Sequence, residues 1–354
     1  MSTEFEFEFD FPFLKELTEE SGVPGYEDRV RELVRREMEG STDEVRTDAM
    51  GNVIGTIEGE SDYTVVVAAH MDEIGFMVRH VTDEGFLELD PLGGWDPRVL
   101  RAQRVTVHTP EGTLPGVIGS APPHTQDEEE REKPPKVEDV HVDLGIDGEA
   151  AAELVSVGDL VTMRQRTEPV GEHVTGKALD DRVCLFAMLE AARRVEDPAV
   201  TIEFAATVQE EVGLRGAGAL GVDTDADLGV ALDVTVANDI PGYEEGEQVT
   251  RLGEGTAVKL KDSSVITTPP VTRRLRSVAE DHDIDHQLEV LPAGGTDTAE
   301  LQRAGGARPV GAISVPTRYL HTVTESAHRG DIAATIDLLA AFLETETGEH
   351  DYAL

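Results

Sequence analysis

The sequence predicts an α/β fold of three layers, α/β/α, interrupted by a smaller β-rich domain. Helical and buried-strand patterns alternate in both end regions of the chain, which is typical of helices packed on a sheet. Between about residues 73 and 168 the pattern changes to short strands with frequent glycines and turns. We therefore expect one α/β domain made of residues 1–72 and 169–354, with an inserted β-rich domain at 73–168.

The α/β domain begins with two predicted helices, at 11–21 and 26–39, which the turn Gly22-Val23-Pro24-Gly25 separates. Two strands follow, and the second is a strongly apolar run that ends at His70-Met71-Asp72. These two strands are expected at 53–57 and 63–69. The further strands of this domain are expected at 201–208 and 228–233, and its further helices at 183–195, 271–282 and 331–345. In the inserted domain we expect strands at 103–108 and 158–163.

Three features do not belong to this alternation. Residues 1–10 alternate Glu and Phe, which fits an edge strand or a frayed tail, and their terminal position favours a tail. Residues 120–139 hold two Pro-Pro pairs and an acidic run, so we expect a mobile surface loop of the kind that is often functional. Cys184, the single cysteine, has apolar neighbours, so we expect a small buried side chain without chemistry.

The chain of 354 residues carries 72 acidic and 30 basic side chains, a formal charge of -42. This charge disfavours nucleic acid and anionic membranes as partners. Only six of the basic residues are Lys, and such an acidic, lysine-poor surface predicts a protein adapted to concentrated salt, hence a halophilic source. No apolar run is long enough to span a bilayer, and the first residues are acidic where a secretory signal is basic. We therefore expect a cytoplasmic protein.

Acidic and imidazole side chains follow several predicted strands or stand in turns. These positions are His70 with Asp72, Asp180 with Asp181, Glu210 with Glu211, Asp233, and His321. Because ligands bind at one edge of open α/β sheets, where strands end, we expect these side chains to converge there. Mixed carboxylate and imidazole ligands suit zinc, cobalt or manganese. The set is large enough for two ions that share a bridging carboxylate.

Taken singly, these motifs also have structural interpretations. His70 and Asp72 share one face of a strand, where the carboxylate can orient the imidazole toward a metal, but a His-x-Asp pair alone is unspecific. Asp180 and Asp181 also fit a helix N-cap with an acidic first turn. A lone carboxylate at Asp233, after an apolar strand, would be costly to bury unless a metal compensates it.

Glu210 and Glu211 close the apolar run at 201–208 and precede a turn at Val212-Gly213. In so acidic a chain they fit a solvated acidic pair. Neighbours at a strand end can also face different ways, so that one carboxylate holds a metal while the other carries protons.

Together these residues resemble the tetrahedral aminopeptidases, a dinuclear metallopeptidase family that also includes glutamyl aminopeptidases and proteins labelled endoglucanase M. The resemblance covers nearly the whole chain, and its order and spacing are highly specific. It rests on SGVPGYE at 21–27, AHMDEIGF at 69–76, GGWD at 93–96, ALDDR at 178–182, QEEVG at 209–213 and RYLH at 318–321.

The resemblance implies a zinc-exopeptidase-like fold and a role for each site residue. Each subunit would hold two divalent ions, which Asp180 would bridge. Zinc and cobalt are the implied metals, with manganese as an alternative. His70 and Asp233 would complete one ion's ligands, and Glu211 and His321 the other's. Glu210 would be the general base, Asp72 would orient His70, and Asp181 would follow a cis peptide bond. The substrate pocket would be lined by Gly294, Gly295, Thr296 and Asp297. A plain turn is the alternative for this last segment.

The resemblance also implies an assembly and a reaction. The inserted domain would mediate dimerisation, and the dimers would form a tetrahedral homo-dodecamer around the active sites. A segment beginning at Pro122-Pro123-His124 would reach toward a neighbouring subunit, although here it is unusually acidic. The reaction would be hydrolysis of N-terminal residues from peptide substrates, with a metal-activated water whose proton Glu210 takes.

Three other functions fit parts of the sequence. A deacylase of N-acylated amino acids or a glycoside hydrolase would use the same fold, but glycosidases normally need a metal-free carboxylate pair, and these carboxylates suit metal ligation. A non-catalytic peptide-binding scaffold would have lost a ligand or the general base, and none is missing.

Overall fold

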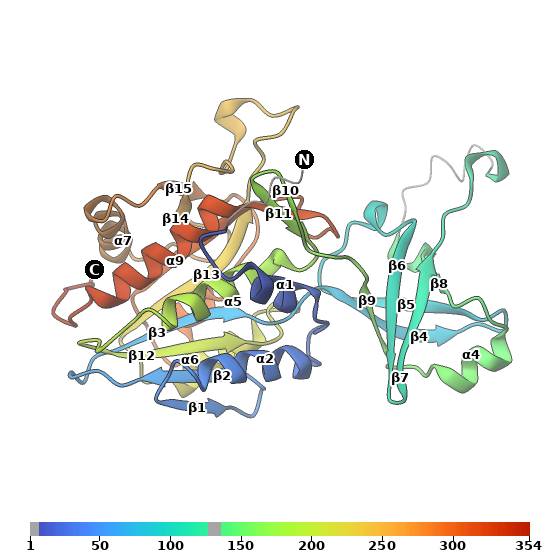
Figure 1. The fold of residues 1–354 in the computed structure, drawn as a ribbon, viewed down its shortest axis with the longest axis horizontal. Coiled ribbons are helices and arrows are strands. Elements are labelled where there is room, and N and C mark those ends of the chain that lie inside the picture. The colour runs from blue at the N-terminus through green and yellow to red at the C-terminus, as the bar shows by residue number, and fades with distance from the viewer. Residues whose placement is uncertain (1–6, 127–135) are drawn as a thin grey trace.

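A computed structural model describes residues 7–126 and 136–354, and within them the chain forms a large mixed sheet with helices and a separate small barrel. The two parts lie side by side along the long axis of the molecule (Figure 1). In the part of the chain that is described, no helix combines the length and the apolar character needed to cross a membrane.

The sheet has eleven strands in the order β1-β2-β12-β3-β13-β16-β17-β11-β10, with β14 and β15 attached beside β16. Its centre is parallel: β12 (Thr201–Thr207) pairs with β3 (Thr64–His70), β3 with β13 (Leu228–Val236), and β13 with β16 (Val310–Arg318). These strands are rich in Val and Ala and buried along nearly their whole length, as expected of parallel strands covered on both faces. The other strands are β1 (Glu44–Thr47), β2 (Val53–Ile57), β10 (Glu168–Val170), β11 (His173–Gly176), β14 (Thr256–Lys261), β15 (His286–Val290) and β17 (Glu325–His328).

Helices cover both faces of this sheet, which confirms the three-layer prediction. One core cluster joins the sheet to α1 (Phe11–Glu19), α2 (Asp28–Met38), α5 (Leu179–Ala192), α7 (Pro269–Asp281) and α9 (Arg329–Glu344). A second cluster joins the opposite face to α6 (Arg215–Asp223) and α8 (Thr298–Arg303). Nearly all of α5 is buried between α1, α9 and the sheet, so its first turn is held firmly, and Cys184 is buried there as predicted.

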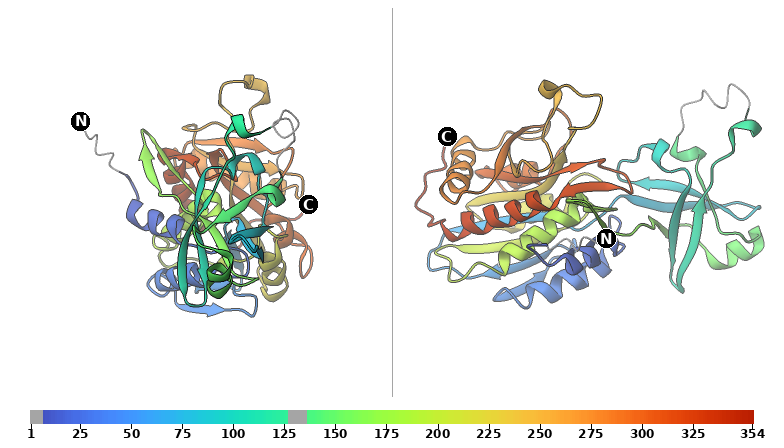
Figure 2. Two further views of the ribbon diagram at one scale, coloured as in Figure 1. Left: turned by 90° about the vertical axis from the view of Figure 1, so that its right-hand side faces the viewer. Right: turned by 45° about the horizontal axis from the view of Figure 1, so that its top comes forward.

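The inserted β-rich unit is a closed barrel of six strands, and Figure 2 shows it at one end of the molecule. Its core includes Phe76, whose ring stacks on Trp95 with 5.2 Å between centroids. The strands are β4 (Gly75–Val81), β5 (Phe86–Leu92), β6 (Gln103–Thr109), β7 (Gly112–Ile118), β8 (His141–Asp143) and β9 (Leu160–Met163), and α4 (Gly148–Leu154) precedes the last. The limits 73–168 and the dimerisation role stay predictions.

The prediction of a frayed N-terminal tail is wrong for the residues that the structure describes. Phe9 is buried and its ring lies 5.5 Å from that of Phe186 on α5, while Phe7 stacks on Phe11 at 4.4 Å. Phe13, in the first turn of α1, lies 5.9 Å from the same Phe186 ring, so Phe9 and Phe13 together cover this apolar part of α5. Residues 1–6 lie outside the described residues, and so does the centre of the predicted mobile loop, 127–135.

Candidate metal centre

The parallel strands deliver most of the predicted site residues to one edge of the sheet. His70 is the last residue of β3, Asp233 lies in β13, Glu210 and Glu211 follow β12, and His321 lies in the turn after β16. These four strands run in the same direction, so their carboxyl ends meet. The convergence expected from the sequence is therefore present.

Asp180 lies between the two imidazoles. Its Oδ1 is 3.3 Å from Nε2 of His70, and its Oδ2 is 3.4 Å from Nε2 of His321. Oε1 of Glu211 is 3.8 Å from the same nitrogen of His321. Ligand atoms of His70, Asp180 and Glu211 all lie within 4.8 Å of one another, which is close enough for one metal ion to contact all three.

A second group of donors also includes His70. Ligand atoms of His70, Asp181 and Asp233 also fall within 4.8 Å of one another, and all three side chains are buried. The peptide bond between Asp180 and Asp181 is cis, as the family resemblance implied. Neither aspartate has helical backbone angles or caps α5, so the alternative of a helix N-cap is wrong.

Asp72 contacts both glutamates as well as the histidine it was expected to orient. Nδ1 of His70 lies 3.2 Å from the backbone oxygen of Asp72 and 3.5 Å from its Oδ1. The backbone N–H groups of Glu210 and Glu211 donate to Oδ1 and Oδ2 of Asp72, at 3.0 and 3.1 Å. One fully buried carboxylate thus holds the end of β12 against the end of β3.

The carboxylates of the site outnumber the positive charges near them. Burial raises the pKa of Asp233 and Glu210 well above their usual values, and burial together with the charge of Asp180 raises the pKa of Glu211 to about 8. Burial alone would lower the pKa of His321, but Asp180 and Glu211 outweigh it and raise that pKa to about 10.

The same excess of carboxylates shifts the pKa values of His70 and Asp180. Burial would lower the pKa of His70, yet the carboxylates of Asp180 and Asp72 raise it well above its usual value. Burial would raise the pKa of Asp180, yet hydrogen bonds from the two imidazoles hold it below its usual range. Six buried or half-buried carboxylates thus surround two imidazoles, and divalent cations would supply the missing charge. They are those of Asp72, Asp180, Asp181, Glu210, Glu211 and Asp233.

The segment predicted to line the substrate pocket lies between β15 and α8 and is only partly exposed. Gly294 and Gly295 face solvent, and Gly294 has a φ of +103°, which disfavours any other residue. Thr296 and Asp297 are buried, and Oγ1 of Thr207 donates to Oδ2 of Asp297 at 2.5 Å. Burial raises the pKa of Asp297 to about 6. Of the four residues, the two glycines are therefore the ones open to a ligand.

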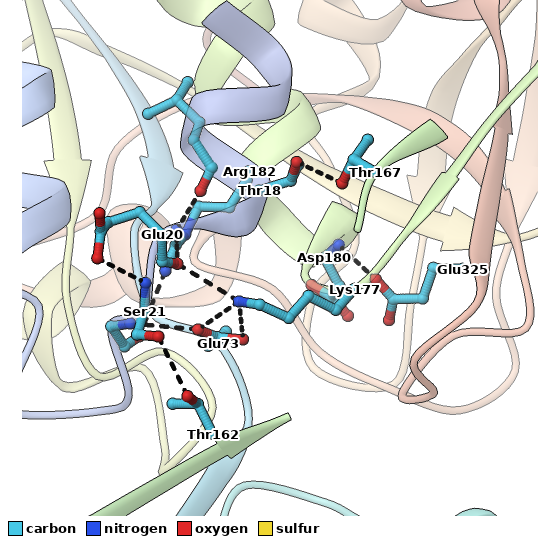
Figure 3. A network of polar contacts seen from close by, with 12 residues as sticks. Thr18, Glu20, Ser21, Glu73, Thr162, Thr167, Lys177, Asp180, Arg182 and Glu325 are labelled. Carbon is cyan, nitrogen blue, oxygen red and sulfur yellow. Dashed lines mark hydrogen bonds and ion pairs between the residues drawn. The ribbon is translucent and has the colours of Figure 1, made fainter. Parts of the chain in front are cut away.

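The sequence did not assign roles to several buried residues that hold the site together (Figure 3). The Arg182 guanidinium donates to the backbone oxygens of Met71 and Leu17, both at 2.5 Å. Nζ of Lys177 lies 2.7 and 2.8 Å from the two carboxylate oxygens of Glu73. Their only sequence signal is their place in the chain: Glu73 and Arg182 belong to the quoted segments 69–76 and 178–182, and Lys177 directly precedes the second.

A model of the family described as M42 glutamyl aminopeptidase matches residues 51–338 of this sequence. The chain belongs to the M42 family. The match covers both the sheet domain and the inserted barrel. The M42 chain is an aminopeptidase and thus a metal-dependent peptide hydrolase, which favours peptide hydrolysis over the glycosidase and scaffold alternatives.

Similar proteins extend the family assignment over almost the full length of the M42 chain. It is 36% identical to a lysyl aminopeptidase of Pyrococcus furiosus over 95% of this chain and 97% of that protein. An aminopeptidase structure from Desulfurococcus kamchatkensis matches with a TM-score of 0.91 at 36% identity, covering 96% and 95% of the two chains. A Pyrococcus horikoshii TET1 peptidase, described as able to assemble into a tetrahedron or a large octahedral shell, matches with a TM-score of 0.85 at 33% identity over 95% and 99%.

Proposed function

We propose that this M42 aminopeptidase removes N-terminal residues from peptides at a pair of divalent metal ions. The position of Asp180 carries the proposal, because one of its oxygens faces the imidazole of His70 and the other faces that of His321. Asp180 would bridge the ions, with His70 and Asp233 on one side and Glu211 and His321 on the other. Zinc, cobalt and manganese all suit this donor set.

The bound ions would supply Lewis acidity that lowers the pKa of a coordinated water to about 7 and polarises the peptide carbonyl. Glu210 would take a proton from the attacking water on its carboxylate and deliver it to the leaving amine nitrogen. In the metal-free protein, burial raises the pKa of Glu210 well above its usual value. Asp72 would fix the ring of His70 and the backbone of Glu210, and Gly294 and Gly295 would let substrate approach the backbone.

A panel of fluorogenic aminoacyl substrates tests the proposed function. Activity with free N-termini, lost on chelation and restored by zinc, cobalt or manganese, supports the metallo-aminopeptidase. Activity restricted to N-acylated amino acids would favour the deacylase instead. Glutamyl, lysyl and apolar substrates in the same panel identify the side-chain preference at the cleaved position.

Glu210→Gln tests the proposed proton carrier. The variant should keep its metals and lose about 10² or more in kcat, the usual size of a general-base contribution. Glu203→Gln is the matched control, because Glu203 lies on β12, the strand that precedes Glu210, and contacts Arg46 and Thr224. Near-normal turnover by a fully metallated Glu210→Gln variant would remove Glu210 from this role.

We also propose that the chain assembles into a tetrahedral homo-dodecamer built from dimers through the barrel. The tetrahedral assembly described for the TET1 relative supports this, as does the place of the barrel at one end of the molecule (Figure 2). Mass measured in solution at physiological and at high salt tests it, and a stable monomer would contradict it. The cytoplasmic location and the halophilic source stay predictions.

A further inference from the structure

One buried carboxylate, that of Glu325, joins the two chain segments that carry Asp180 and His321. Its Oε2 accepts the backbone N–H of Asp180 at 3.0 Å, and its Oε1 accepts that of His321 at 2.9 Å. Figure 3 shows the first of these contacts. Glu325 is only 2% exposed, and as the first residue of β17 it pairs with Gly176 at the end of β11, just before Asp180.

The loop that carries His321 depends on such contacts. Tyr319 and His321 have φ angles of 63° and 57°, in the left-handed region that costs a non-glycine residue about 1–2 kcal/mol. Apart from the bond to Glu325, the described contacts of His321 are those of its ring, including Nδ1 with the backbone oxygen of Gly94 at 2.7 Å. The ring is thus held at one end and the backbone at the other, and Glu325 supplies the backbone contact.

The two oxygens of Glu325 each accept one of these amides. Removing one oxygen would leave a buried N–H without an acceptor, which costs about 1–3 kcal/mol. That cost falls on the backbone of either Asp180 or His321, whose side chains must meet with their facing atoms only 3.4 Å apart. A small shift of either backbone therefore changes the spacing between these two side chains.

We propose that Glu325 is a positioning residue that sets the spacing of Asp180 and His321 and thereby the affinity of the His321 side of the centre for its metal ion. The inference rests on the proposed dinuclear function. It assigns Glu325 neither a metal ion nor a proton of the reaction, only the placement of two ligands. The His70 and Asp233 side, which Glu325 does not contact, should be affected less.

Glu325→Gln tests this, because glutamine keeps the shape but replaces one acceptor with an NH2 group that faces a backbone N–H. Zinc is titrated into metal-free protein against a competing chelator. The parent should bind two ions, and the variant should bind one of them about 10–100-fold more weakly, the range seen when a contact behind a ligand is lost. Its kcat at low zinc should fall with KM little changed, and saturating zinc should restore most of the loss.

Glu346→Gln is the matched control. Glu346 is also fully buried, accepts the backbone N–H groups of Thr347 and Gly348, and accepts the hydroxyl of Tyr352, but it lies near the C-terminus. It should lower thermal stability without changing either zinc affinity. Glu325→Asp, which keeps the charge but reaches less far, should fold and show an intermediate loss of zinc affinity.

Several outcomes separate the possibilities. Parent-like affinity for both ions in a folded Glu325 variant overturns the inference and leaves the proposed function intact if the parent hydrolyses its substrates. Failure of saturating zinc to restore turnover also overturns it, since Glu325 would then act in the chemistry. If neither Glu325 variant folds, the residue supports the fold as a whole and the inference is wrong. A parent that binds no metal contradicts the proposed function itself.

Discussion

The backbone N–H of Glu210 donates to Oδ1 of Asp72 at 3.0 Å, so the proposed proton carrier is fixed to the residue two positions after His70. The other oxygen of Asp72 holds Glu211 in the same way, at 3.1 Å. Adjacent glutamates would otherwise be free to move with the turn that follows β12. A buried acceptor common to both gives each side chain a defined direction.

Asp72→Asn should therefore impair more than the orientation of His70. Asparagine offers one acceptor oxygen where two backbone N–H groups donate, so one glutamate amide loses its partner. We expect kcat/KM to fall by about 10–100-fold, with weaker zinc binding, as for other losses behind a metal ligand. Steady-state kinetics and zinc content after dialysis measure both effects.

Asp147→Asn is a suitable control for this variant. Asp147 caps α4 in the barrel, where its side chain accepts the backbone N–H of Ala150 at 2.9 Å. Its loss should leave kinetics and zinc content unchanged. If Asp72→Asn behaves in the same way, the shared acceptor does not control the position of the glutamates.

Removal of the metal ions should make stability depend strongly on pH. In the metal-free protein the pKa of Glu211 is raised to about 8 and that of His321 to about 10, from 4.5 and 6.5. Between each pair of values the folded state keeps a proton that the unfolded state has released, so stability falls as pH rises. Metal ions compete with these protons and bind more tightly as pH rises.

Melting curves at about pH 6 and about pH 9, with zinc or with chelator, check this sign. The chelated protein should melt at a lower temperature at the higher pH, and the gap between the zinc-bound and chelated proteins should widen. A gap that narrows toward high pH would show that the acidic cluster is not the metal site.

Phe9→Ala tests the correction at the N-terminus. Because Phe9 packs against Phe186 in the main core, the substitution should lower the free energy of unfolding by about 3 kcal/mol. Phe86→Ala, at a position that is 38% exposed, should cost much less. Urea denaturation of both variants measures the loss of unfolding free energy. Equal small losses would show that residues 7–10 form a loose tail after all.

The site residues that sequence patterns could locate are those that follow buried strands. His70, Asp233 and the pair at 210 and 211 each end or interrupt an apolar run. The tendency of open α/β sheets to bind ligands where their strands end was enough to predict convergence. The parallel pairing of these strands in the structure explains it. Arg182 and Glu325 have no such local signal. Arg182 contacts Met71 and Leu17, which lie more than a hundred positions away, and so does Asp180, one of the two partners of Glu325. Phe9 was misread for the same reason, since its burial depends on α5.

Short strands and helices could not be predicted from sequence periodicity either. β17 has four residues and α8 has six, too few for a period to emerge, although β17 supplies Glu325 and α8 follows directly on Asp297. Their positions are fixed by pairing with β11 and by packing against β13. Tertiary contacts, not local sequence, place them.

The ion pair of Lys177 and Glu73 offers a last prediction, because it ties the segment before Asp180 to the segment after Asp72. Both side chains are buried, and burial lowers the pKa of Lys177. Lys177→Met leaves the Glu73 carboxylate without its cation, which should cost about 3–5 kcal/mol of stability. Glu73→Gln in the same chain removes that charge, so the double variant should recover much of the loss. Urea denaturation of the four proteins of this cycle measures the coupling, and additive losses would show that the pair contributes no interaction of its own.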